Sequence, residues 1–280
     1  MTDILNDLSS ESLAVAIKAN LHAFFASIRD SSEVTGDGAH GFRWHTSVSH
    51  PWFNGVLISR PPTAGADQVV RDTLAYFRSH DVGAFTWWLA PSLEPGAWSP
   101  HLLPHGFQYD DNTPGMAINL AALPPLGQQS TIKVVEDRET LDTWARILVR
   151  GFEMPEEMAG VFLAIMESVG IGLPIRHYLG LVDGEPVATS SLFLAAGVAG
   201  IYNVATLPAA RGQGVGSAMT LLPLYEARDL GYHAGILQSS KMGYSLYRRL
   251  GFQKLCQIEH FHWQDPGIRA NARGHRERPA

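Results

Sequence analysis

Cysteine and long apolar runs are nearly absent from this chain of 280 residues, which has a single cysteine, Cys256. One cysteine excludes an intramolecular disulfide framework and favours a reducing compartment. The apolar segments are too short to cross a bilayer. The N-terminal segment Met-Thr-Asp-Ile-Leu-Asn-Asp is acidic, which is not typical of a secretory signal. These features predict a soluble, cytoplasmic protein.

Positive charge is also scarce, with a formal net charge of −6 and a pI near 6.0. This balance argues against a surface that binds nucleic acid, and neither nucleic acid nor membrane is an expected partner. The 45% hydrophobic composition and the length allow a sizeable core and about two domains. Residues 264–280 contain four arginines among small residues and are expected to form a disordered basic tail.

Three alternating glycines, Gly212, Gly214 and Gly216, follow Arg211 between a β-prone segment and a helical pattern. Glycines let the backbone approach a charged group closely. The first N–H groups of a helix lack partners within the helix, and the helix dipole makes that end positive. Arg211 adds a planar cation at the same place. The junction therefore predicts a phosphate-binding site.

The spacing of these glycines excludes two common phosphate loops. A P-loop requires Gly-x-x-x-x-Gly-Lys-Ser/Thr, and no such Lys follows them. A dinucleotide fingerprint requires Gly-x-Gly-x-x-Gly, and Ser217 or Met219 occupies the third position. The remaining pattern is Arg-x-x-Gly-x-Gly after a strand. It resembles the acyl-CoA diphosphate loop of the GNAT family of N-acetyltransferases.

A second segment, Ser240 to Phe252, strengthens this resemblance. The family's usual form is Asn-x-x-Ala-x-x-Leu-Tyr-x-x-x-Gly-Phe, and Leu246-Tyr247 and Gly251-Phe252 match it. Ser240 and Gly243 depart from it, because Asn and Ala are common at those positions. The resemblance covers about residues 131–263. It implies an α/β GNAT fold, a mixed twisted sheet with splayed parallel strands flanked by helices. It also implies an acyl-CoA co-substrate, acetyl-CoA in particular, and an amine acceptor.

The resemblance assigns the cofactor site residue by residue. The cleft would open between strands that end at Thr206 and Gln238, where the pantetheine arm pairs with unsatisfied backbone groups as a pseudo-strand. The diphosphate would bind the backbone amides of the glycine loop. The expected cofactor-binding residues are Val204, Ala205, Thr206, Arg211, Gly212, Gln213, Gly214, Val215, Gly216, Ser217 and Ser240. No metal site is expected, although His260 and His262 have a spacing that points both to one face of a strand.

The resemblance makes Tyr247 the expected general acid, because a phenol with a pKa of about 10 can donate to the departing thiolate at neutral pH. The general base is left open. Many relatives have Glu or Asp on the strand before the loop, where Tyr202 and Asn203 stand here. An ordered water or one of four other side chains could serve instead. Those four are His177, Glu153, Glu156 and Glu157. The acceptor-pocket candidates are residues 152–157, Phe162, Tyr178 and Tyr202.

The pattern of apolar residues and turns predicts the organisation of the chain. Residues 1–120 are expected to form a degenerate GNAT-like domain without a cofactor loop, or an unrelated accessory α/β domain. Residues 121–130 would be a linker, and 131–263 the acyl-CoA-binding domain. Helices are expected at 11–28, 66–78, 138–151, 156–169, from the glycine loop to 230, and 241–250; strands at 42–47, 55–59, 84–89, 116–120, 132–135, 177–182, 187–194, 201–206, 234–238 and 254–263. Cys256 is expected in the core.

Three functions follow from these observations. The first is an N-acetyltransferase that moves an acetyl group from acetyl-CoA to a primary amine of an unidentified small acceptor. The second is a catalytically silent acyl-CoA sensor. The third is a tandem-domain enzyme resembling mycothiol synthase, in which the first domain shapes the acceptor site. The length of the acyl chain is open, and so is the choice between a monomer and a homodimer.

Overall fold

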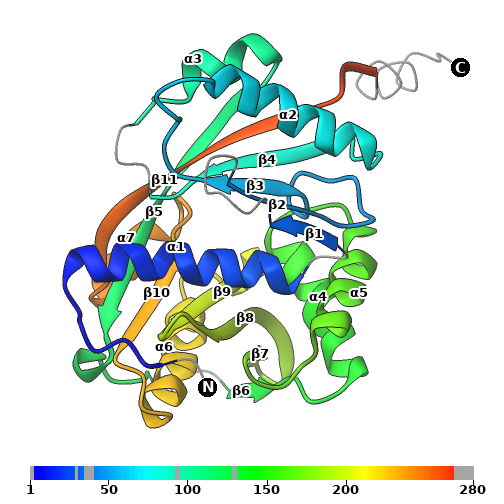
Figure 1. Cartoon of the computed structure of the whole chain (residues 1–280). Coiled ribbons are helices and arrows are strands. Elements are labelled where there is room, and N and C mark those ends of the chain that lie inside the picture. The colour runs from blue at the N-terminus through cyan, green and yellow to red at the C-terminus, as the bar shows by residue number, and fades with distance from the viewer. Residues whose placement is uncertain (1–2, 29–30, 35–40, 92–94, 128–130, 268–280) are drawn as a thin grey trace, which may run out of the picture. The chain divides into compact units, whose positions relative to one another are not determined.

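The computed structural model describes residues 3–28, 31–34, 41–91, 95–127 and 131–267, which form two compact units (Figure 1). Unit 1 comprises Met1–Ile28 and Pro114–Leu255, and unit 2 comprises Arg29–Thr113 and Cys256–Ala280. This division differs from the continuous segments expected from the sequence. The N-terminal helix packs into unit 1 rather than with residues 31–113, and the last strand ends in unit 2.

Unit 1 contains a mixed sheet with the strand order β5-β10-β9-β8-β7-β6. Strands β9 and β10 are parallel, whereas the pairs β5–β10, β8–β9, β7–β8 and β6–β7 are antiparallel. The strands are β5 (Gln108–Asn119, in this unit from residue 114), β6 (Thr131–Val134), β7 (Ile175–Val182), β8 (Glu185–Ala195), β9 (Val198–Thr206) and β10 (Ala234–Gln238). The helices are α1 (Ser10–Ser27), η2 (Leu120–Ala122), α4 (Arg138–Gly151), α5 (Met158–Val169), η3 (Pro208–Ala210), α6 (Val215–Asp229) and α7 (Tyr244–Leu250).

Helices cover both faces of this sheet. Successive residues of a strand point to opposite faces, and β7 shows which helices lie on each. Tyr178 belongs to the core under α6 and α7, whereas its neighbour His177 contacts Trp144 of α4 with ring centroids 4.5 Å apart. On the α4 face, α1 docks through Asn20, which donates to the carbonyl oxygen of Ala195 at 2.9 Å.

Helix α4 shows how the local sequence determines an element. Asp137 caps its first turn, accepting from the backbone N–H of Thr140 at 2.8 Å, and the Thr140 hydroxyl returns to the backbone of Asp137 in a capping box. The apolar residues then recur at helical spacing and are buried, with Trp144 and Leu148 fully enclosed. The helix spans the residues that the sequence predicts.

Unit 2 is built around β1 (Ser31–Val34), β2 (Phe42–His45), β3 (Gly55–Ile58), β4 (Ala84–Leu89) and β11 (Gln253–Gln264, in this unit from residue 256). Its helices are α2 (Ala66–Ser79), α3 (Ser99–Leu102) and η1 (Leu103–His105). Strands β3 and β4 are parallel and are joined through α2. Trp87 and Trp98 lie in its core, and Trp44 is also buried, whereas Trp52 is 42% exposed.

Three expectations from the sequence concern residues of unit 2. The register of β11 with β4 places His260 opposite Trp88 and His262 opposite Thr86, so both imidazoles lie on one face as the spacing predicts. Cys256 is only partly buried and is not the core residue that was expected. Residues 268–280 of the expected tail lie outside the described residues.

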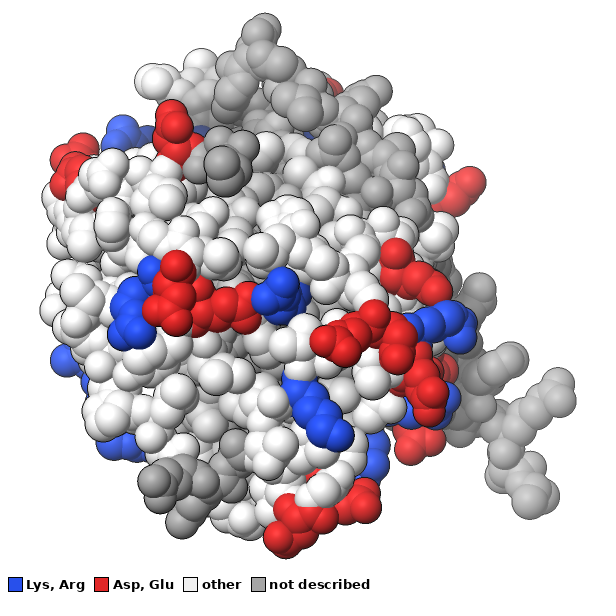
Figure 2. Space-filling model, turned by 90° about the horizontal axis from the view of Figure 1, so that it is seen from below, with Lys and Arg blue, Asp and Glu red and all other residues white. Residues whose placement is uncertain are grey.

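The surface in Figure 2 mixes both signs of charge: Lys and Arg side chains lie close to Asp and Glu, and most of this face is uncharged. Among the helices that the structure describes, none is long and apolar enough to span a bilayer.

Candidate functional site

The ladder between β9 and β10 is short and leaves the end of β9 open. It pairs Ala199–Ile201 with Gly235–Leu237 and stops there. On its other side β9 continues to pair with β8 as far as Thr206. Residues 202–206 therefore have no described strand partner on the β10 side, and this stretch includes the predicted residues Val204, Ala205 and Thr206. We call this feature the β9 opening.

A β-bulge lies at the start of the β9 opening. Thr189 and Ser191 of β8 pair with Ala205 and Tyr202, so Ser190 faces the two intervening residues, Asn203 and Val204. Asn203 has a φ of 55°, in the left-handed region that asparagine tolerates better than most residues. The bulge thus turns the strand just where it leaves β10.

The glycine loop leads into α6 in the expected way. Gly212 and Gly214 have φ values of 79° and 80°. Gly214 is the residue before the helix, and no described side chain caps that end of α6. The first N–H groups of α6 are consequently not capped by a side chain, and Gly212, Gln213 and Gly214 are exposed.

The same loop lies beside the other predicted segments. A β-carbon on Gly216 would lie 3.4 Å from Leu246 of α7 and 3.8 Å from the hydroxyl of Thr206. The first turn of α6, where Val215 is buried and Ser217 partly so, therefore adjoins both the β9 opening and α7. Ser240 lies just before α7, and its hydroxyl accepts from the backbone N–H of Gly243 at 3.1 Å.

Arg211 is engaged with the protein. Its Nε donates to the carbonyl oxygen of Thr206 at 3.1 Å, and Nη2 donates to the carbonyl oxygen of Gly151 at 3.0 Å. The guanidinium also pairs with Glu153 at 3.3 Å. Arg211 thus fastens the glycine loop to the end of β9 and to the end of α4, which the sequence did not predict.

Tyr247 is packed inside unit 1. It is 7% exposed, and its ring contacts Phe252 with centroids 5.8 Å apart. Burial raises the pKa of Tyr247 to about 12, against the opposing effect of a hydrogen bond with Thr220 of α6. A β-carbon on Gly243 would lie 2.8 Å from the Tyr247 ring, which explains why glycine replaces the more common alanine at this position.

The structure shows the environments of His177, one of the candidates for the general base, and of Tyr202, which stands where many relatives have Glu or Asp. His177 is fully buried, and burial lowers its pKa to about 4. Tyr202 donates from its hydroxyl to Oδ1 of Asn20 at 2.7 Å and stacks on Phe24 with centroids 4.2 Å apart. Burial raises the pKa of Tyr202 strongly. Both side chains are therefore uncharged at neutral pH.

The candidate acceptor residues occupy different environments. Phe152 is 38% exposed at the end of α4, beside Glu153, whose φ of 57° is left-handed. Phe162 is buried in α5, and Tyr178 is buried with its hydroxyl donating to Glu226 of α6 at 2.6 Å. Sequence reasoning missed Asn20, whose only signal was a polar residue on the apolar side of α1.

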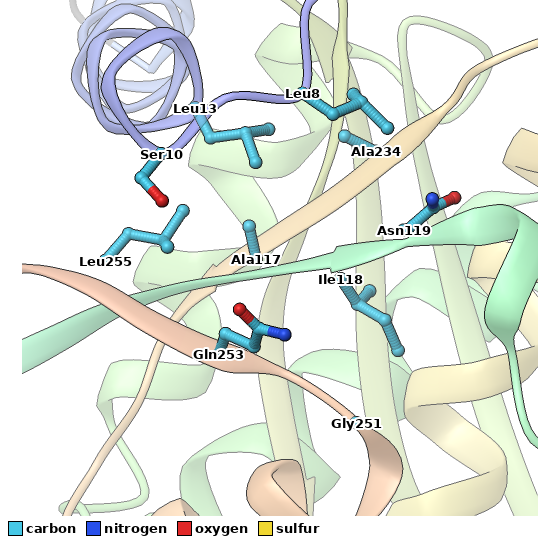
Figure 3. Close-up of a pocket in the computed structure, with 10 residues that line it drawn as sticks. All are labelled: Leu8, Ser10, Leu13, Ala117, Ile118, Asn119, Ala234, Gly251, Gln253 and Leu255. Atoms are coloured by element: carbon cyan, nitrogen blue, oxygen red, sulfur yellow. The ribbon is translucent and has the colours of Figure 1, made fainter.

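A separate cavity of about 170 Å³ lies in unit 1 and contains none of the predicted site residues (Figure 3). Figure 3 shows the side chains of Leu8, Leu13, Ser10 and Leu255 among those that line it. Its lining is Leu8, Ser10, Leu13, Ala117, Ile118, Asn119, Ala234, Gly251, Gln253 and Leu255.

The family comparison identifies the region that holds the β9 opening. Residues 174–254 match the model of the acetyltransferase (GNAT) domain. The match contains β7 to β10, the glycine loop and Tyr247. The protein therefore carries an acetyltransferase (GNAT) domain at residues 174–254, which confirms the resemblance seen in the motifs. No curated protein matches the chain in sequence.

Solved structures resemble the chain over most of its length. A GCN5-related N-acetyltransferase from Kribbella flavida is 19% identical, with 94% of this chain and 97% of that chain covered and a TM-score of 0.68. One from Sphaerobacter thermophilus is 16% identical, with 80% and 76% covered and a TM-score of 0.59. A tandem GNAT protein from the clavulanic acid biosynthesis pathway is 13% identical, with 80% and 78% covered and a TM-score of 0.55. These likenesses confirm the expected GNAT fold.

Proposed function

We propose that the protein is an N-acetyltransferase that moves an acetyl group from acetyl-CoA to a primary amine. The observation that carries this proposal is the conjunction, within residues 174–254, of the β9 opening with an uncapped helix entered through left-handed glycines. An acyl-CoA needs both features, because its pantetheine arm has amides to pair and its diphosphate has charge to neutralise.

The backbone supplies most of the binding site in this proposal. Val204 to Thr206 pair with the pantetheine arm, and the amides of Gln213 to Ser217 bind the diphosphate. Arg211 holds Gly212 and the rest of the loop in place while its charge lies beside the phosphates. Ser240, whose oxygen already accepts from Gly243, keeps its hydroxyl hydrogen for the cofactor.

Tyr247 acts on the leaving group. The amine nitrogen forms a bond to the thioester carbonyl carbon, the C–S bond then breaks, and the electron pair stays on sulfur. The pKa of Tyr247 is about 12, and that of an ordinary thiol is about 8.5. Full proton transfer to the thiolate is therefore uphill, so Tyr247 serves as a hydrogen-bond donor to the departing sulfur. The ammonium formed on attack loses its proton to solvent or to a general base, for which no residue is assigned.

Unit 2 fits a degenerate GNAT-like unit in this proposal. Its β3-α2-β4 segment repeats the arrangement β9-α6-β10, and Gly65 before α2 has a φ of 84° like that of Gly214. The parallel pairing of β3 and β4 continues to Ile58 and Leu89, the last residues of both strands. The described part of unit 2 therefore lacks a counterpart of the β9 opening, and the acyl donor is assigned to unit 1 alone.

Two glycine variants test the cofactor site. Gly214→Ala and Gly184→Ala each add a β-carbon to a residue in the left-handed region, where φ is 80° and 86°. Beyond the adjacent residues of the chain, no described heavy atom lies within 4 Å of either added β-carbon. Both should lose about 1 kcal/mol of stability from the left-handed conformation. Only Gly214→Ala should weaken acetyl-CoA binding measured by calorimetry, by roughly ten-fold or about 1.4 kcal/mol. Gly184 lies in the β7–β8 turn and is not part of the glycine loop.

The function itself is tested with the wild-type protein, acetyl-CoA and a panel of small amines, by following release of CoA thiol. Amine-dependent release supports the transferase. Binding of acetyl-CoA without release for any amine would favour the silent sensor, and no heat of binding would remove both functions.

A further inference from the structure

A chain of three buried or partly buried polar side chains leads from the middle of β7 to the bulge in β9. Nδ1 of His177 lies 2.7 Å from the hydroxyl oxygen of Ser191 on β8. Nδ2 of Asn203 donates to the same oxygen at 3.2 Å. The Ser191 hydroxyl group therefore connects the side chain of Asn203 to that of His177.

This arrangement costs stability. His177 and Ser191 are fully buried, and Nε2 of His177 has no partner among the described residues. An unpartnered buried polar atom costs about 1–3 kcal/mol. A left-handed residue adds strain at Asn203. Unpaired buried groups and backbone strain of this kind concentrate at functional sites.

This series of hydrogen-bonded side chains ends at the β9 opening. The carbonyl oxygen of Asn203 accepts from the hydroxyl of Thr189 at 2.8 Å, so both the backbone and the side chain of Asn203 are held. Asn203 is the second residue of β9 beyond the last pair with β10. If Asn203 changed its conformation, the backbone groups of residues 204–206 in the β9 opening would move with it.

We propose that His177 and Ser191 are positioning residues that act through Asn203 to hold the bulge, and so aim the backbone groups of the β9 opening at the reacting end of the acyl donor. This inference rests on the proposed function. Neither side chain is assigned contact with substrate. Because burial holds the pKa of His177 near 4, the chain of hydrogen bonds keeps the same protonation state throughout the neutral range.

Two adjacent serines provide a matched test. Ser190 and Ser191 are both fully buried on β8, but the Ser190 hydroxyl has no described hydrogen-bond partner. Ser191→Ala should lower kcat roughly ten- to a hundred-fold, as expected from slight misplacement of reacting groups, with the KM for acetyl-CoA little changed. Ser190→Ala should leave kcat near the wild-type value. Equal kcat in the two variants would overturn the proposal.

Variants of His177 and Asn203, the two ends of this series of hydrogen bonds, separate positioning from a merely structural role. The amide of His177→Asn can reach the place of Nδ1, so this variant should recover most of the kcat that His177→Leu loses. Glycine accepts a φ of 55° without strain, so Asn203→Gly keeps the backbone conformation and removes the side chain. A wild-type kcat in Asn203→Gly would show that the side chains play no part.

A readout independent of turnover distinguishes this proposal from the proposed function. Amide hydrogen exchange of residues 203–206 in the protein without acetyl-CoA should be faster in Ser191→Ala than in Ser190→Ala or the wild type. Unchanged exchange in Ser191→Ala would refute positioning even if the enzyme is active. Faster exchange in Ser191→Ala, found together with a wild-type protein that binds no acetyl-CoA, would instead leave the bulge assignment standing and remove the proposed function.

Discussion

At the scale of single residues, Tyr247 carries the most specific chemistry. Its position in the second motif made it the expected acid, and the structure adds that its side chain is 7% exposed. Burial works against ionisation of the phenol, because the charged form is poorly solvated there. Tyr247 therefore stays a donor over the whole neutral and mildly alkaline range.

Replacing Tyr247 with Phe removes one hydroxyl and keeps the ring packed on Phe252. We expect kcat to fall about a hundred-fold, as on removal of one hydrogen-bond donor to developing negative charge, while the acetyl-CoA dissociation constant changes little. Steady-state kinetics and calorimetry measure the two effects. Tyr244→Phe, one turn earlier in α7, is the control. An unchanged kcat in Tyr247→Phe would remove this residue from the mechanism.

Arg211 shows where residue-scale prediction stops. Its place in Arg-x-x-Gly-x-Gly indicated a cation at a phosphate site, and the motif could not show that its side chain reaches Gly151 and Glu153. Those partners are more than 50 residues away in the sequence. Contacts of this kind depend on how α4 and β9 come together, which the spacing of a local motif does not encode.

At the scale of elements, strongly periodic segments were predictable. Helix α4 and strands β4 and β10 span the predicted residues, because their apolar spacing and caps agree. Strand β1 was not predicted, since Ser31 to Val34 has no apolar alternation. The β9 opening could be expected only through the resemblance to the family, because nothing in the composition of Val204 to Thr206 distinguishes an unpaired edge from a paired one.

The docking of α1 on the sheet gives a prediction at this scale. Asn20 is fully buried and joins α1 to β8 and to the hydroxyl of Tyr202. Asn20→Ala would leave that hydroxyl and a β8 carbonyl oxygen unpaired, and should lower the free energy of unfolding by about 2 kcal/mol or more.

Denaturant unfolding measures this loss, and two further variants interpret it. Val15→Ala, at a residue of α1 that is 62% exposed, should change stability by less than about 0.5 kcal/mol. Adding Tyr202→Phe to Asn20→Ala should cost less than the sum of the two single changes, because the partner hydroxyl is already gone. Strict additivity would show that the Asn20–Tyr202 hydrogen bond contributes nothing.

At the scale of the whole molecule, the order of segments along the chain does not match the compact units. The Pro-rich stretch near residue 124, which was expected to be a linker, lies within unit 1. Helix α1 packs with β8 and β9 although unit 2 follows it in the sequence, and residues 115–119 of β5 pair with β10. Such long-range exchanges leave no periodic signal, because each segment is an ordinary helix or strand in its own sequence. The fold class was predictable from the motifs, and the discontinuous units were not.

The stability of the molecule should depend on pH through His177. Its pKa is about 4 when folded and about 6.5 when unfolded. The unfolded chain therefore binds the proton more readily, so the free energy of unfolding falls as the pH drops from about 6.5 to about 4, by up to about 3 kcal/mol from this residue. Asn does not titrate. His177→Asn should accordingly lose less stability than the wild type between pH 7 and pH 4, as measured by urea unfolding at each pH. Parallel pH dependence of the two proteins would contradict a neutral, buried His177.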